Sequence, residues 1–207
     1  PRKIIIVDSA SPIKPDLSTE DPRIEFISLS TNAGHSTNHT GKYCGWTRSV
    51  MLGMQYAIAN DAEYYVYVEQ DALLSGKGII EYCVDKMTAP YMFGSGEGTP
   101  QLLQQSFFII ARSGMERFLS RLMAITARDG DMCPEDKFHI SASSWPIRLA
   151  SHIMRNKPTK HKKRKLSRKI YSSFINRMKN YDRLPIGYGR TRPLNTSDTY
   201  FYFQHGT

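Results

Sequence analysis

Residues 64–71 read YYVYVEQD, and this stretch decides the fold class that the rest of the chain has to satisfy. Its five β-branched and aromatic residues favour a buried strand over residues 64–68. Side chains alternate along a strand, so Glu69 and Asp71 are expected to point the same way from its carboxyl end, where α/β sheets bind ligands. Two carboxylates there suit a divalent cation; the simpler interpretation is a pair of acidic turn residues.

The sequence on either side of this stretch alternates short apolar runs with helical periodicity, which is typical of an α/β domain. Strands are expected at residues 4–7, 24–29, 64–68, 91–93, 105–111 and 200–204. Helices are expected at residues 46–58, 78–87, 115–126 and 165–179, and a further helix is expected to begin at residues 135–136.

The charge of the chain is concentrated in one place. The 207 residues suit one domain and carry a formal net charge of +9. Residues 155–179 contain 11 of the 28 Lys and Arg residues and no acid, so the remaining chain has 17 basic against 19 acidic residues. A near-neutral domain with one basic segment is not what a general nucleic-acid binder requires.

The basic segment has an apolar residue at every fourth position of its expected helix: Leu166, Ile170, Phe174 and Met178. A cationic amphipathic helix of this kind can make peripheral contact with an anionic membrane. It can equally be a solvated helix whose apolar stripe packs on the domain. Nucleic-acid binding is disfavoured, because aromatic residues do not alternate with the basic ones here as they usually do in proteins that bind single-stranded nucleic acid.

Other features set the expected compartment. No apolar run approaches the ~20 residues that span a bilayer, and residues 4–7 are too short for the apolar part of a signal peptide. Cys44, Cys83 and Cys133 are odd in number and lack the spacing of a zinc site. We therefore expect a cytoplasmic protein, either free or peripherally attached to a membrane.

The order of motifs resembles the nucleotide-binding half of GT-A type glycosyltransferases. Two strands are followed by an Asn-Gly loop, a helix with an arginine in its first turn, and an aromatic strand that ends in an acid-x-acid motif. The residues that carry this resemblance are Asn32, Gly34, Thr47, Arg48, Asn60, Asp61, Glu69, Gln70 and Asp71.

The resemblance covers roughly residues 3–140 and the last few residues. It implies a single-domain, Rossmann-like nucleotide-binding α/β fold with a mixed central sheet flanked by helices and a basic helical segment towards the C-terminus. The implied parts are a nucleotide-sugar-binding part (1–90), an acceptor-binding and catalytic part (91–154), the basic segment (155–182), and a C-terminal strand and tail (183–207).

The resemblance also implies a metal, Mn²⁺ or Mg²⁺, that bridges the diphosphate of a nucleotide sugar, with a UDP-sugar favoured. Asp71 would bind the metal directly. Glu69 departs from the usual first Asp and would face the ribose or the metal through water, with Gln70 between the two. His205 would be the third metal ligand, folded back over the diphosphate; otherwise it is an ordinary surface histidine.

The nucleotide is expected to contact the end of the first strand and the start of the first helix. Val7, Asp8 and Ser9 would face the base and ribose, and Thr47 and Arg48 would lie near the diphosphate. A helix N-terminus favours an anion, and an arginine offers a bidentate fork to phosphate. Alternatively, Asp8 simply ends a strand and Arg48 makes a surface ion pair.

An acid pair at the start of a later helix is the candidate catalytic site. Pro134 precedes Glu135 and Asp136, which the resemblance makes the base region of inverting enzymes. We expect Asp136 to be the base and Glu135 to orient the acceptor, although the two can exchange roles. The simpler interpretation is helix capping. The glycine-rich break at residues 94–98 and the glutamines after it are the expected region for donor sugar and acceptor.

These expectations define a metal-dependent glycosyltransferase, in particular a hexosyltransferase. It would move a sugar from a nucleotide diphosphate sugar to a hydroxyl of a glycan, glycolipid or glycoprotein acceptor by an inverting single displacement. The alternative is a non-catalytic binding module that uses the basic helix to bind nucleic acid or an anionic membrane.

Overall fold

The computed structural model describes residues 1–14, 16, 21–39, 41–96, 101–144, 180–189 and 199–204, with backbone only at residues 203 and 204. The basic segment 155–179 and the candidate metal ligand His205 therefore lie outside the described residues.

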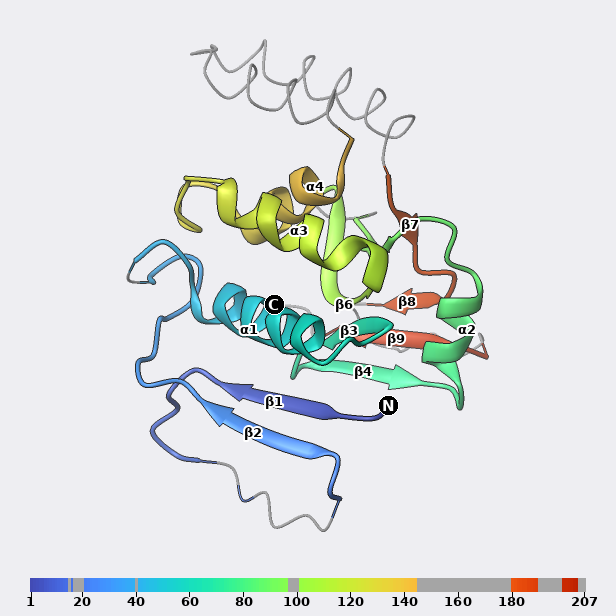
Figure 1. Cartoon of the computed structure of the whole chain (residues 1–207), viewed down its shortest axis with the longest axis horizontal. Helices are drawn as coiled ribbons and strands as arrows, with labels where there is room; N and C mark the ends of the chain where they lie inside the picture. Colours follow the sequence, from blue (N-terminus) through green and yellow to red (C-terminus); the bar gives the residue numbers. More distant parts are fainter. Residues whose placement is uncertain are drawn as a thin grey trace.

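The described part of the chain is a mixed α/β structure of four helices and nine strands (Figure 1). This confirms the predicted α/β class. The helices are α1 (Gly45–Ala59), α2 (Ile79–Asp85), α3 (Arg112–Ala124) and α4 (Pro134–Ala142). The strands are β1 (Ile4–Asp8), β2 (Ile24–Ser28), β3 (Tyr64–Val68), β4 (Ala72–Ser75), β5 (Tyr91–Ser95), β6 (Leu103–Ala111), β7 (Asp182–Arg183), β8 (Gly187–Gly189) and β9 (Phe201–Gln204).

The largest sheet has the order β3-β6-β5-β7. Strand β6 runs antiparallel to both β3 and β5, and β7 is parallel to β5, so the sheet is mixed. Its register pairs Tyr64 with Ala111 and Val68 with Phe107. Strands β4, β9 and β8 form a second sheet.

Strand β6 is buried on both faces and joins two hydrophobic clusters. Phe108 and Ile110 pack with residues of α1, α3 and α4, whereas Phe107 and Ile109 pack with residues of α2 and β9. This division follows directly from the alternation of side chains along a strand. Because helices cover one face of β6 and a helix and a second sheet cover the other, its sequence is expected to be continuously apolar, as it is at residues 107–110.

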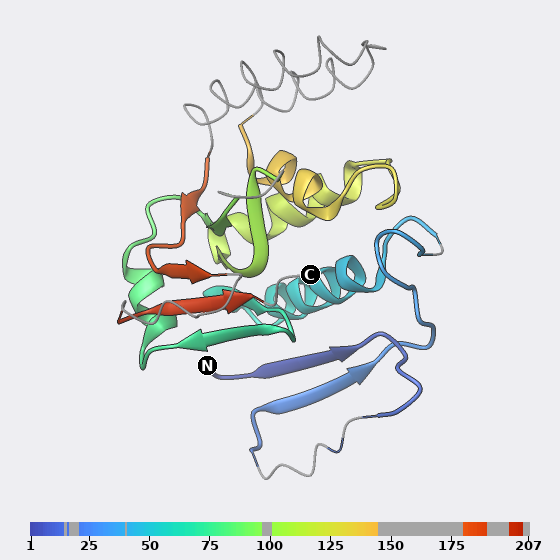
Figure 2. The same cartoon turned by 180° about the vertical axis from the view of Figure 1, so that it is seen from behind.

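Strands β1 and β2 form a separate parallel pair, with Ile4 opposite Ile24 and Asp8 opposite Ser28. Figures 1 and 2 show α1 between this pair and the helices α3 and α4. The expectation of one central sheet that includes the first strands is therefore corrected: among the described strands, β1 is laddered only to β2 and β3 only to β6. A cleft occupies the space between β1 and β3.

Most predicted elements occur within a few residues of the expected bounds, but three short strands were not predicted. Strand β4 begins directly after the acidic motif and pairs with β9, while β7 and β8 pair with β5 and β9. Each depends on a partner that is distant in the sequence. Among the described helices, none combines the length and hydropathy needed to cross a bilayer.

Candidate functional site

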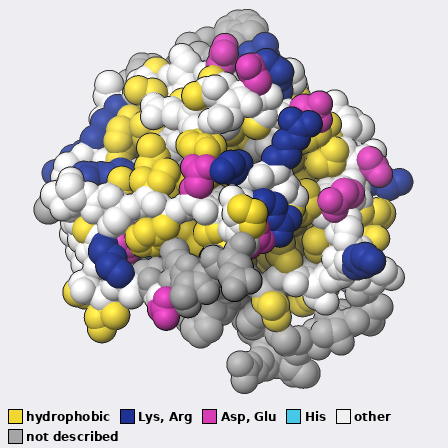
Figure 3. All heavy atoms as spheres, turned by 60° about the horizontal axis from the view of Figure 1, so that its bottom comes forward, with side chains coloured by type: hydrophobic (Ala, Val, Ile, Leu, Met, Phe, Trp, Pro, Cys, Tyr) yellow, Lys and Arg dark blue, Asp and Glu magenta, His cyan; other side chains and the backbone are white. Residues whose placement is uncertain are grey.

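The cleft that separates β1 from β3 has a volume of about 1700 Å³. The two strands and one side of α1 line it along its length, and the start of α4 and part of α2 also contribute to the lining. On the surface that Figure 3 presents, acidic and basic side chains are interspersed among hydrophobic ones. The site residues that line the cleft are Val7, Asp8, Ser9, Glu69, Gln70, Asp71 and Glu135.

The acidic motif lies in a turn that is held on the central sheet. The Glu69 N–H donates to Ser106 O at 2.7 Å, and the Ala72 N–H donates back to Glu69 O at 3.0 Å. The chain therefore turns immediately after Val68 instead of continuing as a strand. Glu69 is half-buried and Asp71 is exposed, and both line the cleft.

Glu69 lies under the influence of two other carboxylates of this cleft. Burial raises the pKa of Glu69, and the negative charges of Asp71 and Glu135 raise it further. A cation bound beside Glu69 would relieve both the repulsion and the cost of burying its charge. The cleft therefore favours a positively charged ligand on its acidic wall.

Asp8, at the end of β1, is already satisfied by its own surroundings. Its carboxylate accepts hydrogen bonds from Lys14 Nζ at 2.5 Å, from Ser28 Oγ at 2.9 Å and from the Ser11 N–H at 3.1 Å. The hydrogen bond from Lys14, followed by that from Ser11, holds the pKa of Asp8 well below its usual range. Asp8 thus orders the turn after β1, and its carboxylate would have to leave these partners to contact a ribose.

The end of β1 approaches the start of α1 closely. A Cβ atom on Gly45 would lie 2.7 Å from Ser9 Oγ, so only glycine fits at this position without a shift. Ser9 Oγ is buried and has no hydrogen-bond partner among the described residues. Ser9 thus brings a polar group without a partner to the lining of the cleft.

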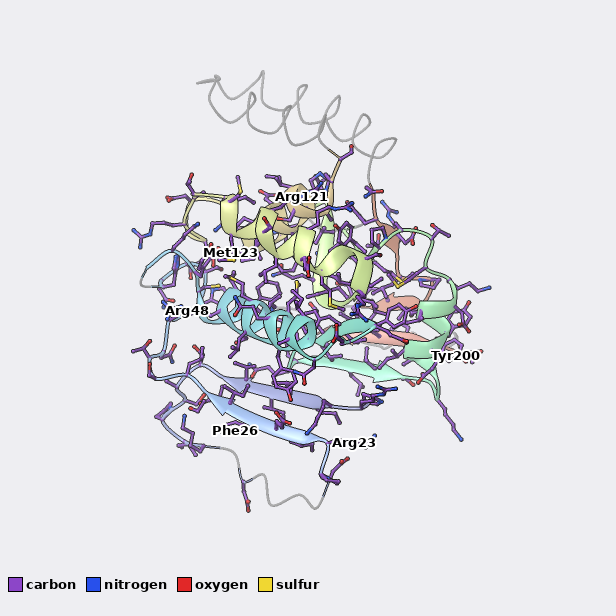
Figure 4. All side chains as sticks on the ribbon, viewed as in Figure 1. Arg23, Phe26, Arg48, Arg121, Met123 and Tyr200 are labelled. Atoms are coloured by element: carbon purple, nitrogen blue, oxygen red, sulfur yellow. The ribbon has the colours of Figure 1, made fainter. Side chains whose placement is uncertain are left out.

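Thr47 and Arg48 do not line the cleft. Thr47 is fully buried behind the start of α1, where its hydroxyl lies 3.5 Å from Cys44 Sγ. Arg48 is directed to the preceding loop (Figure 4): its Nε donates to Tyr43 O at 3.1 Å and its Nη1 to Thr31 Oγ1 at 3.4 Å. In this structure both residues order the loop before α1.

The acid pair at the start of α4 is divided by the helix. Pro134 occupies the first helical position, and Glu135 lines the cleft. Asp136 is exposed and does not line it. Because successive helix residues point in different directions, only one of two adjacent acids faces a given side. The geometry therefore brings Glu135 to the cleft and leaves Asp136 outside.

The sequence did not point to Trp46 as a cleft residue, because its position fitted the apolar periodicity of α1. The indole ring packs on Tyr67, with the ring centroids 5.5 Å apart, and on Phe138 at 5.0 Å. Gln104, Gln105 and Ser106 of β6 also line the cleft. A tryptophan directly after a glycine at a helix start was the available signal.

A metal would find only part of its ligand set here. Within the described ranges, no three His, Cys, Asp or Glu side chains are grouped closely enough to hold an ion. Glu69 and Asp71 offer the oxygen ligands that Mn²⁺ and Mg²⁺ prefer, so the donor set fits such an ion.

Searches of protein-family models, curated proteins and solved structures found no match to this chain. A function for the protein therefore has to be inferred from the arrangement of the cleft.

Proposed function

We propose that the protein is a metal-dependent glycosyltransferase of GT-A type that uses a nucleotide diphosphate sugar, with a UDP-sugar favoured. The observation that supports this proposal is the shared cleft that runs along β1 and β3 and includes their carboxyl ends. It brings Ser9, the acidic motif and Glu135 to one cavity, although they are far apart in the sequence. Ligand binding at the carboxyl ends of strands is the general rule for α/β sheets.

The acidic wall is the proposed metal and diphosphate site. Asp71 would hold Mn²⁺ or Mg²⁺, with Glu69 and His205 assisting. The ion would stabilise the charge that develops on the departing diphosphate. The end of β1, from Val7 to Ser9, would contact the base and ribose, while Thr47 and Arg48 hold the loop that frames the nucleotide.

Glu135 is the proposed catalytic base, in place of Asp136, because Glu135 faces the cleft. Its carboxylate would take the proton of the acceptor hydroxyl while that oxygen bonds to the anomeric carbon. The bond from this carbon to the diphosphate breaks in the same step, and the configuration inverts. The acceptor would be a hydroxyl of a glycan, glycolipid or glycoprotein.

Titration calorimetry with UDP in the presence of Mn²⁺ tests the binding site. We expect the wild-type protein to bind UDP only with the metal, and Asp71→Ala to weaken this binding by ~100-fold, at the upper end of the effect of disturbing a metal site. Asp131→Ala, which removes an exposed acid that does not line the cleft, is the matched control and should bind normally.

The alternative function, attachment through the basic segment, gives the opposite result. Wild-type protein would then bind no nucleotide with metal present, and deletion of residues 155–179 would abolish its binding to anionic vesicles or nucleic acid.

For catalysis, Glu135→Gln should remove sugar transfer while UDP binding is kept. Residual transfer close to that of the wild type would exclude Glu135 as the base.

A further inference from the structure

A fully buried ion pair lies behind the cleft, between Asp129 and Lys137. Both side chains have no exposed surface, and Lys137 Nζ lies 2.5 Å from Asp129 Oδ1. Neither residue lines the cleft. A buried ion pair contributes little net stability, because the cost of removing two charges from water offsets their attraction. Its presence therefore calls for a role other than stability.

The remaining hydrogen bonds of this pair connect two loops. Asp129 Oδ2 accepts the Cys44 N–H at 2.7 Å, and Lys137 Nζ also donates to Ala127 O at 2.7 Å. The Asp129 N–H in turn donates to Lys42 O at 3.0 Å. The segment that enters α1 is thus fixed to the segment that enters α4.

Both of these helix starts are walls of the cleft. Cys44 immediately precedes α1, whose first residues carry Trp46, and Lys137 lies two positions after Glu135 in the first turns of α4. Trp46 also packs on Phe138, the neighbour of Lys137. The ion pair therefore connects the helix start that carries Trp46 with the helix start that carries Glu135.

Two further hydrogen bonds hold the loop before α1, one to the end of α3 and one to the segment before α4. Lys42 Nζ donates to Met123 O at the end of α3, at 2.9 Å, and Arg128 Nε donates to Gly41 O at 3.1 Å. Figure 4 shows Met123 near the end of α3, on the same side of the molecule as Arg48 in α1. These bonds are exposed, so the buried pair is the part that water cannot replace.

We infer that Asp129 and Lys137 are positioning residues that hold the starts of α1 and α4 at a fixed spacing across the cleft. The consequence for catalysis rests on the proposed function, because it requires Glu135 to be the base. The consequence for the position of Trp46 does not.

The test uses Trp46 as a reporter that needs no ligand. The chain has two tryptophans, so Trp145→Phe leaves Trp46 as the only one, and this variant is the background. Lys137→Met leaves the Asp129 charge buried without its partner and is expected to be strongly destabilised. The double variant Asp129→Asn/Lys137→Met removes both charges and retains an oxygen acceptor for the Cys44 N–H, so it should fold even if the single variant does not.

We expect the emission of Trp46 in the folded double variant to shift to the red and acrylamide to quench it more strongly than in the background. Leu122→Ala, a cavity in the buried part of α3, is the matched control. It should lower stability without changing the emission or quenching of Trp46. Unchanged emission and quenching in the double variant would overturn the positioning role.

Transfer kinetics then separate this inference from the proposed function. In the double variant we expect kcat to fall ~10- to 100-fold, as for a misplaced catalytic group, while metal-dependent UDP affinity stays close to that of the background. Normal kcat in the double variant would contradict the inference. If the background itself neither binds UDP nor transfers sugar, the proposed function fails, and the Trp46 measurements still decide whether the ion pair positions the helix starts.

Discussion

The two walls of the cleft differ in how they are supported. The β3 wall belongs to a sheet whose strand β6 has five consecutive residues with no exposed surface, at positions 106–110. The β1 wall belongs to a pair of strands in which Asp8 is the only buried residue. Phe26, in the middle of β2, is 37% exposed and lies towards the periphery of the molecule (Figure 4).

Because of this difference, the residues proposed for metal binding and catalysis are attached to the well-packed wall, and those proposed for nucleotide binding are attached to the less buried one. The acidic motif and Glu135 are attached to the well-packed wall, through Ser106 of β6 and through Phe138 of α4. The β1 wall supplies the end of β1, which is proposed to contact the base and ribose. Metal and base would therefore keep their places while the nucleotide-facing wall adjusts.

The largest expected effect tests the packing of the two walls. The Phe108 ring contacts those of Tyr65, Tyr67, Phe93 and Phe138, so Phe108→Ala should lower the free energy of unfolding by about 3–5 kcal/mol. Phe26→Ala on β2 should lower it by less than about 1 kcal/mol, because this side chain remains partly in water. Denaturant titrations of both variants provide the measurement. Equal losses would show that the β1 wall is as well packed as the β3 wall.

A smaller effect is the pH dependence of stability, which should differ between the two walls. His139 of α4 is buried, with Nδ1 3.1 Å from the Tyr181 hydroxyl, and burial lowers its pKa to about 4. An unfolded histidine has a pKa near 6.5, so the unfolded state binds the extra proton between these values. Stability should therefore fall by up to about 3 kcal/mol as the pH drops from about 6.5 to 4. His139→Gln should remove this contribution, so denaturant titrations across the range should show a smaller loss of stability towards low pH than in the wild type.

The β1 wall should respond to acid in a different range. The pKa of Asp8 is held below its usual value, mainly by the hydrogen bond from Lys14, so its contribution is complete above about pH 4 and is lost as the pH falls below that. Asp8→Asn should leave the slope between pH 6.5 and 4 unchanged. If Asp8→Asn instead flattens that slope, the assignment of the slope to His139 is wrong.

The smallest effect concerns α1, which packs on both walls. A Cβ on Gly53 would lie 2.8 Å from Tyr65 Oη on β3, so Gly53→Ala should cost about 1–3 kcal/mol although alanine is the better helix former. Tyr65→Phe removes the atom in closest contact. The double variant Gly53→Ala/Tyr65→Phe should therefore be more stable than the sum of the single changes predicts, as a double-mutant cycle would measure. Additive losses would mean that α1 moves off β3 at little cost.

The sequence predicted the elements whose signal is local and missed those that depend on a distant partner. Residues 64–68 and 107–111 carry continuous runs of apolar, aromatic or β-branched residues, and both lie in strands. Residues 72–75 form β4 only because β9 pairs with them. The separation of β1 from β3 also has no local signal, since each strand has the same pattern with or without a neighbour on its second edge.

Which residues line the cleft could likewise be predicted at the ends of strands but not on the helices. A residue at the end of a strand reaches the cleft by topology alone, which is why Ser9 and the acidic motif are found there. Whether a helix residue faces the cleft depends on the rotation of the helix about its axis, which a single sequence position does not reveal. Arg48 and Asp136 accordingly face away from the cleft, while Trp46 and Glu135 face it.

The facing edges of β1 and β3 have a consequence for how the cleft can change by mutation. An edge that borders a cleft instead of another strand offers the N–H and C=O groups of alternate residues to whatever occupies the space. These groups belong to the peptide chain, and every residue except proline carries both. A substitution can alter the shape and charge of this cleft, but almost every variant keeps the same backbone N–H and C=O groups along the two strand edges.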